Sequence, residues 1–286
     1  MTADHTAGHR TRHTARHTAR HTTRQTARWL ALLGAAVVAS SACAQVADAA
    51  ADPSATAAAD PGEFKLTLGH YAYHLRGDGS AGHGDDLNLR YRRGGRTVWL
   101  GVYQDASTPR QWRAGWDDQW DVPASAFINA AGPAQLLPSL QVASGGFVGA
   151  SLALQVGAPF YAQLGIGRTN LRPYANLNFD PNDALMATLG WQGEGGRQAA
   201  LAVIADDRLG TGQQHHHLTL RWPLQPGLRL TADLLHKQGR GDGGPVNTWG
   251  WTLGLDGARW FGRLVHDPKQ NFSTQDAWRL SAGRRF

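Results

Sequence analysis

The sequence predicts an all-β protein, an antiparallel up-and-down transmembrane β-barrel of 14 strands. Apolar residues alternate with polar or small ones through much of 63–286, in segments of about ten residues, as transmembrane strands do. Tight Gly- or Pro-containing turns alternate with longer polar connections in the second half. No later apolar run reaches the roughly 20 residues of a membrane-spanning helix. Because only helices and closed barrels satisfy their backbone polar groups in lipid, the pattern predicts a barrel.

Composition supports a turn-rich β protein made outside the cytoplasm. The chain has 286 residues with 35 Gly, 11 Trp and a single Cys. Its formal charge of +6 is concentrated at the start, where residues 1–28 carry six arginines and one acid, Asp4, for a net +5. The remainder is therefore about +1, since 6 − 5 = 1. This balance gives no reason to expect a nucleic-acid partner.

Residues 1–44 are interpreted as an export signal that includes a His/Arg repeat. A four-residue period runs through 5–28 and forms a basic region. A metal-binding His tract is disfavoured there, because the arginines repel a cation. The apolar stretch 29–41 is too short to span a bilayer, and Ala42-Cys43-Ala44 offers a cleavage site. Residues 45–62 are expected to be a flexible lead-in, which leaves 63–286 as the barrel.

Strands of the barrel are expected throughout 63–286. The clearest ones lie in the second half, where Leu218, Leu220 and Trp222 alternate with polar neighbours. Earlier strands are expected at 63–75, 86–93, 96–104, 135–143, 147–156, 160–169 and 172–180. Seven more in the second half give 14, with 12 as the alternative if a weak pair fails. Residues 105–134 are expected to form one long external segment.

Connection lengths predict an orientation. Long polar connections are expected at 206–215, 237–247 and 266–276, and tight turns at 193–196, 225–227 and 256–258. Outer-membrane barrels have long external loops and short periplasmic turns. The long connections are therefore expected outside the cell and Phe286 on the periplasmic side.

The last eleven residues carry a further signal. Trp278, Leu280 and Ala282 share one strand face, and the chain stops at Phe286. This ending resembles the C-terminal signature of bacterial outer-membrane β-barrels, in which a final aromatic closes the last strand and marks the chain for assembly. The resemblance identifies the general class and no subfamily. It implies an outer-membrane location, with outer-membrane lipid, lipopolysaccharide and the barrel-assembly machinery as partners.

Two histidines conflict with the strand pattern. His70 and His74 have the parity of Leu66 and Leu68, which would place imidazoles on the lipid-facing side. A bulge at Gly69 would reverse the faces and turn Tyr71 and Tyr73 outward. The bulge is the preferred interpretation.

The inward parity of several charged residues suggests a function. Lumen-lining or ligand-binding roles are predicted for Arg90, Arg92, Asn176, Asn178, Asp180, His217, Arg221, Arg229, Asp233, Arg263 and Arg279. Few inward acids oppose these arginines, chiefly Asp180 and Asp233, and a positive lumen favours anions. The predicted function is a porin-like channel for small, preferably anionic solutes, without a cofactor or metal.

Two alternatives stay open. A lipid- or lipopolysaccharide-modifying hydrolase needs a Ser-His pair on its outer surface, and no such pair can be assembled around His266. A structural barrel would have its lumen plugged by Arg, Tyr and Trp side chains.

Overall fold

The computed structural model describes residues 62–76, 79, 81–106, 110–123, 132–168, 183–206 and 210–286, all within the compact unit Ala42–Phe286. The expected export signal, and all but the last residue of the lead-in, lie outside these residues. The strands are β1 (Glu63–Leu75), β2 (Ala81–Arg93), β3 (Arg96–Asp105), β4 (Gln111–Asp117), β5 (Trp120–Asp121), β6 (Ala134–Ala143), β7 (Phe147–Val156), β8 (Phe160–Arg168), β9 (Asp183–Gly193), β10 (Arg197–Asp206), β11 (Gln213–Gln225), β12 (Leu228–Gly241), β13 (Gly244–Gly257), β14 (Trp260–Asp267) and β15 (Gln275–Arg285). Two 3-10 turns, η1 (Glu194–Gly196) and η2 (Gln270–Phe272), complete the set.

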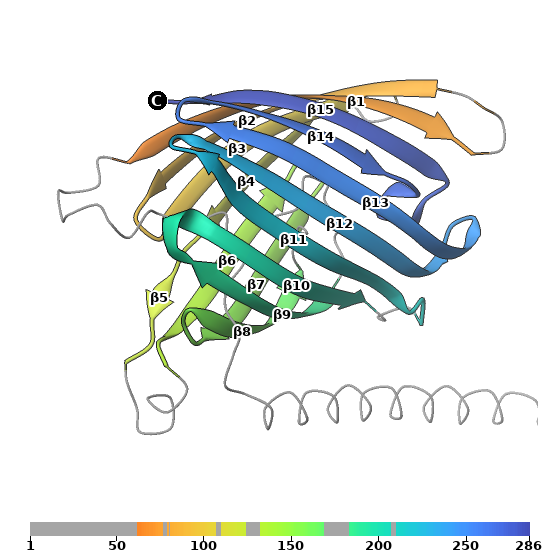
Figure 1. Ribbon diagram of the computed structural model, residues 1–286. Helices are drawn as coiled ribbons and strands as arrows, with labels where there is room; N and C mark the ends of the chain where they lie inside the picture. Colours follow the sequence, from red (N-terminus) through yellow and green to blue (C-terminus); the bar gives the residue numbers. More distant parts are fainter. Residues whose placement is uncertain are drawn as a thin grey trace, which may run out of the picture. The chain divides into compact units, whose positions relative to one another are not determined.

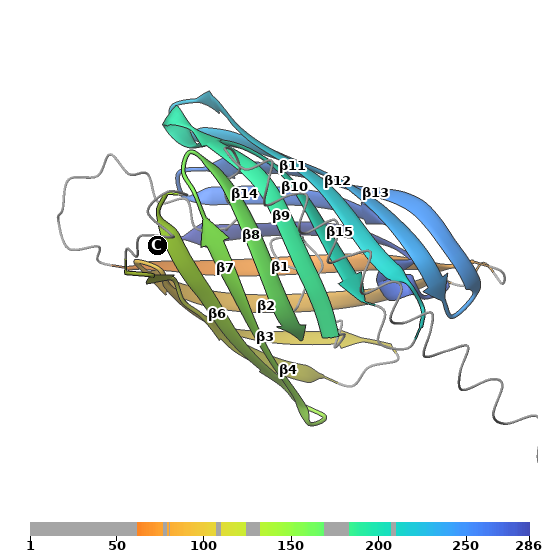
Figure 2. The same ribbon diagram turned by 90° about the horizontal axis from the view of Figure 1, so that it is seen from below.

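The strands form one closed antiparallel sheet (Figures 1 and 2). Consecutive strands pair along the chain, and β1 pairs with β15 to close the ring. β4 and β5 both pair with β6 and share one position in the ring, so the 15 segments make 15 − 1 = 14 strands. The predicted fold class and strand number are confirmed.

One of the 14 strands comes from a part of the chain that was not predicted to form a strand. β4 lies within 105–134, which was expected to be a single external segment. Its alternation of Trp112 and Ala114 with Arg113 was overlooked, because it lasts only seven residues before an interruption at Asp118. The expected strand at 172–180 lies outside the described residues, and β8 pairs directly with β9.

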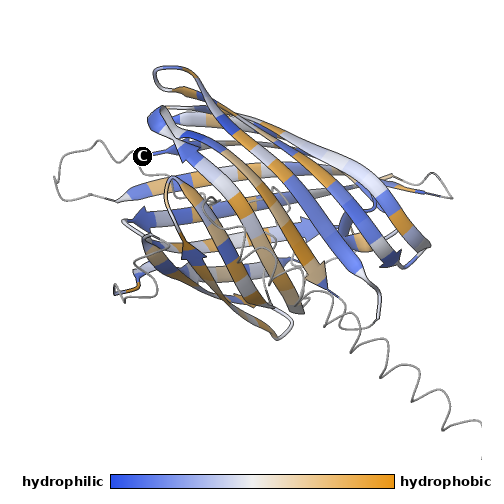
Figure 3. Cartoon of the chain, turned by 60° about the horizontal axis from the view of Figure 1, so that its bottom comes forward, coloured by the Kyte–Doolittle hydropathy of each residue, from blue (hydrophilic) through white to orange (hydrophobic). Residues whose placement is uncertain are grey.

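The strands contain both hydrophobic and hydrophilic residues (Figure 3), and the two faces of the sheet differ in the exposure of their side chains. Outward side chains are apolar and open, with Leu68, Ile166 and Leu280 exposed by 59, 63 and 62%. Inward side chains are packed, and Tyr71 and Tyr161 are 1% and 0% exposed. An apolar exterior around a polar interior is the pattern of a barrel in lipid. Neither of the helical turns in the described part of the chain is long and apolar enough to cross a membrane.

The two ends of the barrel have different connections. The end at the Pro226-Gly227 turn, here the turn end, also contains the short connections at 94–95, 157–159 and 258–259. The opposite end, at the Asp242-Gly243 turn, is the loop end. The expected long loop over 237–247 is wrong, because β12 and β13 continue through most of it and meet in a two-residue turn.

Gly69 does not form a bulge, so that expectation is also wrong. Pairing of β1 with β2 and β15 is continuous through this residue, and His70 therefore faces outward while Tyr71 faces inward. The glycine has another role. A Cβ at this position would overlap the Asp86 carboxylate and lie 3.1 Å from Arg279 Nε. Because it has no side chain, Gly69 leaves room for an ion pair that crosses β1 and joins the strands on either side of it, β2 and β15.

Replacing Gly69 by Ala is expected to lower the free energy of unfolding by about 1–3 kcal/mol, because the added methyl displaces a buried ion pair. Urea unfolding of the refolded barrel in micelles, followed by tryptophan fluorescence, measures the change. Gly262→Ala is the matched control, since a Cβ there meets nothing within 4 Å. Equal unfolding midpoints for the two variants would contradict this account of Gly69.

Candidate functional site: the inner surface of the barrel

The inner surface has two walls of different chemistry. From β6 to β10, the described inward side chains are amides, hydroxyls, small residues and apolar groups, except for Asp206, a carboxylate with inward parity at the loop end of β10. The remaining strands, β11–β15 and β1–β4, form a charged wall. This division was not predicted, because it depends on which strands are neighbours in the closed ring.

Cations and aromatic rings pack together on the charged wall. Arg279 Nη2 donates to Asp86 Oδ2 across 3.1 Å, and both side chains are buried. The same guanidinium lies 5.1 Å above the Tyr71 ring, and Arg113 lies 5.3 Å above the Tyr103 ring. Burying these charges is costly unless ion pairs and π faces replace water, and here both do so.

Two tyrosines extend this cluster by a directed hydrogen-bond chain. The Tyr103 hydroxyl donates to Asp105 Oδ2 over 2.6 Å. Since its proton is used there, Tyr103 accepts the 2.6 Å hydrogen bond from the Tyr73 hydroxyl. The chain fixes both rings against the inner wall.

A second cluster centres on Asp233 of β12. His217 Nδ1 lies 2.9 Å from Asp233 Oδ1, and Thr219 Oγ1 donates to Asp233 Oδ2 over 2.7 Å. The His217 and Asp233 side chains are 1% and 7% exposed. A buried His-Asp pair is a common part of hydrolytic sites. The neighbouring hydroxyl of Thr219 donates to the carboxylate, however, so it is held as a donor and is not activated as a nucleophile.

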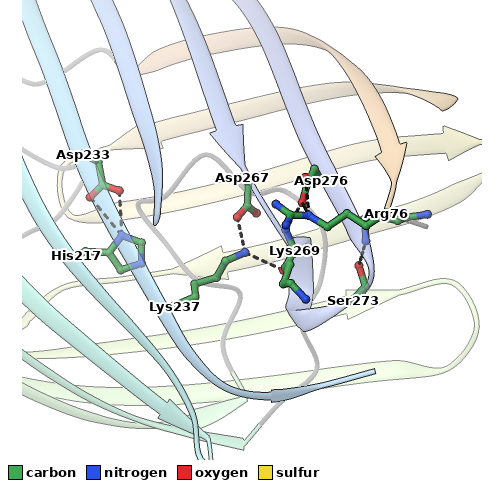
Figure 4. A network of polar contacts seen from close by, with 9 residues as sticks. Arg76, His217, Asp233, Lys237, Asp267, Lys269, Ser273 and Asp276 are labelled. Carbon is green, nitrogen blue, oxygen red and sulfur yellow. Dashed lines mark hydrogen bonds and ion pairs between the residues drawn. The ribbon is translucent and has the colours of Figure 1, made fainter. Parts of the chain in front are cut away.

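A third network holds the β14–β15 connection against the loop end of the barrel (Figure 4). Lys237 Nζ lies 2.5 Å from Asp267 Oδ1 and donates to the backbone oxygen of Lys269 over 2.9 Å. Asp276 accepts from Arg76 Nε at 2.8 Å and from the Lys269 backbone at 2.9 Å. These contacts anchor residues 268–274, here the η2 loop, at both of its ends.

The η2 loop also has a strained backbone. Lys269, Asn271 and Phe272 have φ values of 49, 50 and 58°, in the left-handed region that non-glycine residues avoid. Phe272 is 3% exposed and stacks on the His215 ring at 5.1 Å. Packing and the Lys237 clamp therefore stabilise a conformation that the backbone alone would not prefer.

The structure places eight of the predicted site residues on the inner face, namely Arg90, Arg92, His217, Arg221, Arg229, Asp233, Arg263 and Arg279. Asn176, Asn178 and Asp180 lie outside the described residues. The structure brings His217 to Asp233 and pairs Arg279 with Asp86. A role for these residues in solute binding stays a prediction.

Several residues of these networks were missed. Asp86, Asp256 and Asp267 add inward carboxylates, and Asp256 accepts from Arg285 Nη2 at 2.6 Å. The positive excess is therefore smaller than the sequence suggested. Lys237 has the inward parity of Asp233, and a longer β12 in the prediction would have revealed it.

No family model and no curated protein matches the chain. Solved structures resemble it at low identity. Omp33 of Acinetobacter baumannii aligns with a TM-score of 0.46 at 10% identity, covering 78% of this chain and 99% of that one. Salmonella typhi OmpF, in a complex with daunomycin, gives 0.40 at 10% identity, with 78% and 97% covered. A Rhodopseudomonas blastica porin variant gives 0.40 at 10%, with 78% and 100% covered.

The assignment to a class depends on the barrel itself. Aromatic side chains border the apolar exterior at both ends, with Trp222, Trp260 and Phe286 at the turn end and Trp112, Trp249 and Trp278 at the loop end. Closure, an apolar band and two aromatic borders occur together in barrels that span a bilayer. This is a transmembrane β-barrel.

Replacing Lys237 by Met is expected to release the η2 loop without unfolding the barrel. The change leaves Asp267 buried without its cation, which costs about 3–5 kcal/mol, while the strand ladder stays intact. Backbone amides of 268–274 should exchange hydrogen at least about tenfold faster. Lys269→Met is the control, because Lys269 joins the clamp through its backbone atoms. Unchanged exchange in the Lys237 variant would show that the clamp does not hold the loop.

Proposed function

We propose that the protein is a narrow porin-like channel that passes small, preferably anionic solutes across the outer membrane. The supporting observation is the charge balance of the charged wall. Its inward cations are Lys65, Arg90, Arg92, Arg113, Arg221, Arg229, Lys237, Arg263, Arg279 and Arg285. The inward acids of these strands are fewer, namely Glu63, Asp86, Asp105, Asp117, Asp233, Asp256 and Asp267, and the described inward acids elsewhere are Asp121 of β5 and Asp206 of β10, which leave a small excess of cations.

Several of these acids already have basic partners. Asp86, Asp256 and Asp267 pair with Arg279, Arg285 and Lys237, respectively. The cations face a wall whose described inward side chains include a single acid, Asp206, rather than a second ring of acids. In a bore with low-dielectric walls, an excess of cations raises the local concentration of anions.

The packing of the inner surface implies that the passage is narrow. Tyr71, Tyr161 and Lys237 point inward and are at most 1% exposed. Side chains at this density leave room for small solutes at most. The same packing would suit a plugged structural barrel, so conductance is the deciding measurement.

Purified protein in planar bilayers is expected to conduct with anion preference, measured as the reversal potential in a KCl gradient. Arg221→Glu combined with Arg229→Glu should shift that potential toward cations, because two inward positive charges become negative. The matched control is Arg197→Glu on the exterior, where the guanidinium lies 5.0 Å above the Trp222 ring.

Heat-modifiable migration on gels verifies that each variant is folded. A folded wild-type barrel without conductance would support the plugged scaffold. An unchanged reversal potential in the double variant would refute the role of these arginines.

Orientation can be tested by insertion. A short epitope after Gly243 should be reachable by antibody on intact cells, whereas one after Pro226 should be reachable only after permeabilisation. Both sites are tight turns, where insertions are tolerated, so the pair is matched. The opposite result would place the turn end outside. Recognition of β15 by the assembly machinery stays a prediction.

A further inference from the structure

A row of imidazole and indole rings surrounds part of the exterior near the loop end. It runs across seven strands, from β11 through β15 to β1 and β2. Its members, called here the imidazole–indole belt, are His216, His236, Trp249, Trp251, His266, Trp278, His70 and His83. The sequence analysis predicted that a bulge at Gly69 would turn His70 away from the lipid-facing side. The structure has no such bulge and places His70 outward, in this row.

Ring contacts join neighbouring members of the belt from strand to strand. The His216 and His236 rings lie 5.7 Å apart, and His236 lies 4.6 Å from Trp249. Further along, the His266 ring lies 4.4 Å from Trp278 and 6.1 Å from Trp251. These contacts form two groups of three rings, His216–His236–Trp249 and Trp251–His266–Trp278, which lie side by side on neighbouring strands.

The belt ends in an exposed ion-pairing group on β1 and β2. His70 Nδ1 lies 2.8 Å from Asp85 Oδ1, with side chains 56% and 60% exposed. The His83 ring stacks on His70 at 5.5 Å. A carboxylate and two imidazoles would be expensive in the hydrocarbon, so this group lies at the polar boundary.

The distance between the aromatic borders at the loop end and the turn end agrees with a position of the belt at the polar boundary of the membrane. Trp278 and Phe286 lie on the same face of the last strand, 286 − 278 = 8 residues apart. At about 3.3 Å per residue and a strand tilt near 40°, this spans roughly 20 Å along the membrane normal. An apolar band of about 25 Å is typical, so the belt lies where headgroups begin.

The border at the turn end uses different chemistry. There the guanidinium of Arg284 lies 5.2 Å above Trp260, and that of Arg197 lies 5.0 Å above Trp222. Permanent cations accompany indoles at one border, and titratable imidazoles accompany them at the other.

We propose that the imidazole–indole belt binds the phosphate groups of outer-leaflet glycolipid headgroups, with the indoles packed against the adjoining acyl chains. Imidazoles donate hydrogen bonds to phosphate oxygens and become cations in mild acid, which adds charge attraction. The inference rests on the membrane placement of the barrel and does not require that the bore conducts.

The other groups that face the belt set its charge. On the exterior, the acids beside it are Asp85, which is bonded to His70, and Asp276, which is bonded to Arg76. Asn247 and Gln214 supply neutral partners to His236 and His216, respectively. Arg240 lies farther toward the loop end. His74 of β1 also faces outward, opposite Asp276 in the strand pairing. No exterior acid described lies beside His216 or His236, and Asp276, which interacts with His266, is already held by Arg76; these three histidines are therefore the residues to test.

The test measures binding of lipid A by the refolded barrel in neutral-detergent micelles, using native mass spectrometry. Diphosphoryl lipid A is compared with the same lipid after removal of its phosphates, at pH 5.5 and 7.5. At pH 5.5 the phosphorylated lipid should bind about tenfold more tightly, and the ratio should be smaller at pH 7.5, because imidazole in general is a cation only in mild acid.

The variant His216→Gln/His236→Gln/His266→Gln should lose most of the preference for the phosphorylated lipid at pH 5.5. Arg197→Gln is the control, since it removes a cation from the exterior at the opposite border of the barrel. Gel mobility without heating confirms that both are folded. Equal affinity of the wild type for the two lipids, or a triple variant that binds like the wild type, would overturn the proposal. Conductance is measured separately, so a closed bore leaves this test valid.

Discussion

Closure of the sheet between its first and last strands is the constraint on which the rest of the molecule depends. Phe64 and Phe286 exchange backbone hydrogen bonds of 2.9 Å in both directions, and their rings lie 6.2 Å apart. In lipid, an unpaired strand edge leaves polar groups that water cannot satisfy. The Arg279–Asp86 ion pair reinforces this seam from inside, because it joins β15 to β2 over β1. Gly69 is the residue that makes room for it.

Closure also determines how charge is distributed inside the barrel. The strands next to the seam, β11–β15 and β1–β4, bring acids and bases from both ends of the chain together. Asp86 and Arg279 are 193 positions apart in the sequence. The strands of the middle of the chain, β6–β10, form a wall whose described inward side chains are uncharged apart from Asp206. Buried charges need partners within reach, and the seam is where distant segments can supply them.

The sequence allowed the faces of most strands to be predicted, because a period of two survives any tilt or curvature of the sheet. His217, Arg221 and Arg279 were placed correctly on this basis. The short β4 was missed because its alternation is brief, and the extension of β12 was missed because polar residues resembled a loop. Long-range contacts could not be predicted. A glycine is needed at position 69 because the side chains of Asp86 and Arg279, from two other strands, lie against it. The sequence around Gly69 gives no sign of either residue.

The three consecutive histidines of β11 show how the closed sheet separates two chemistries. Alternation turns His215 and His217 inward, where one stacks on Phe272 and the other bonds Asp233. It turns His216 outward, into the belt beside His236. Three adjacent imidazoles therefore cannot converge on one ion. The inner two are buried against the inner wall. The outer one faces the headgroup layer, where a lipid phosphate can reach it. A single strand thus contributes to the bore and to the membrane boundary at the same height, and substitutions one residue apart separate the two roles.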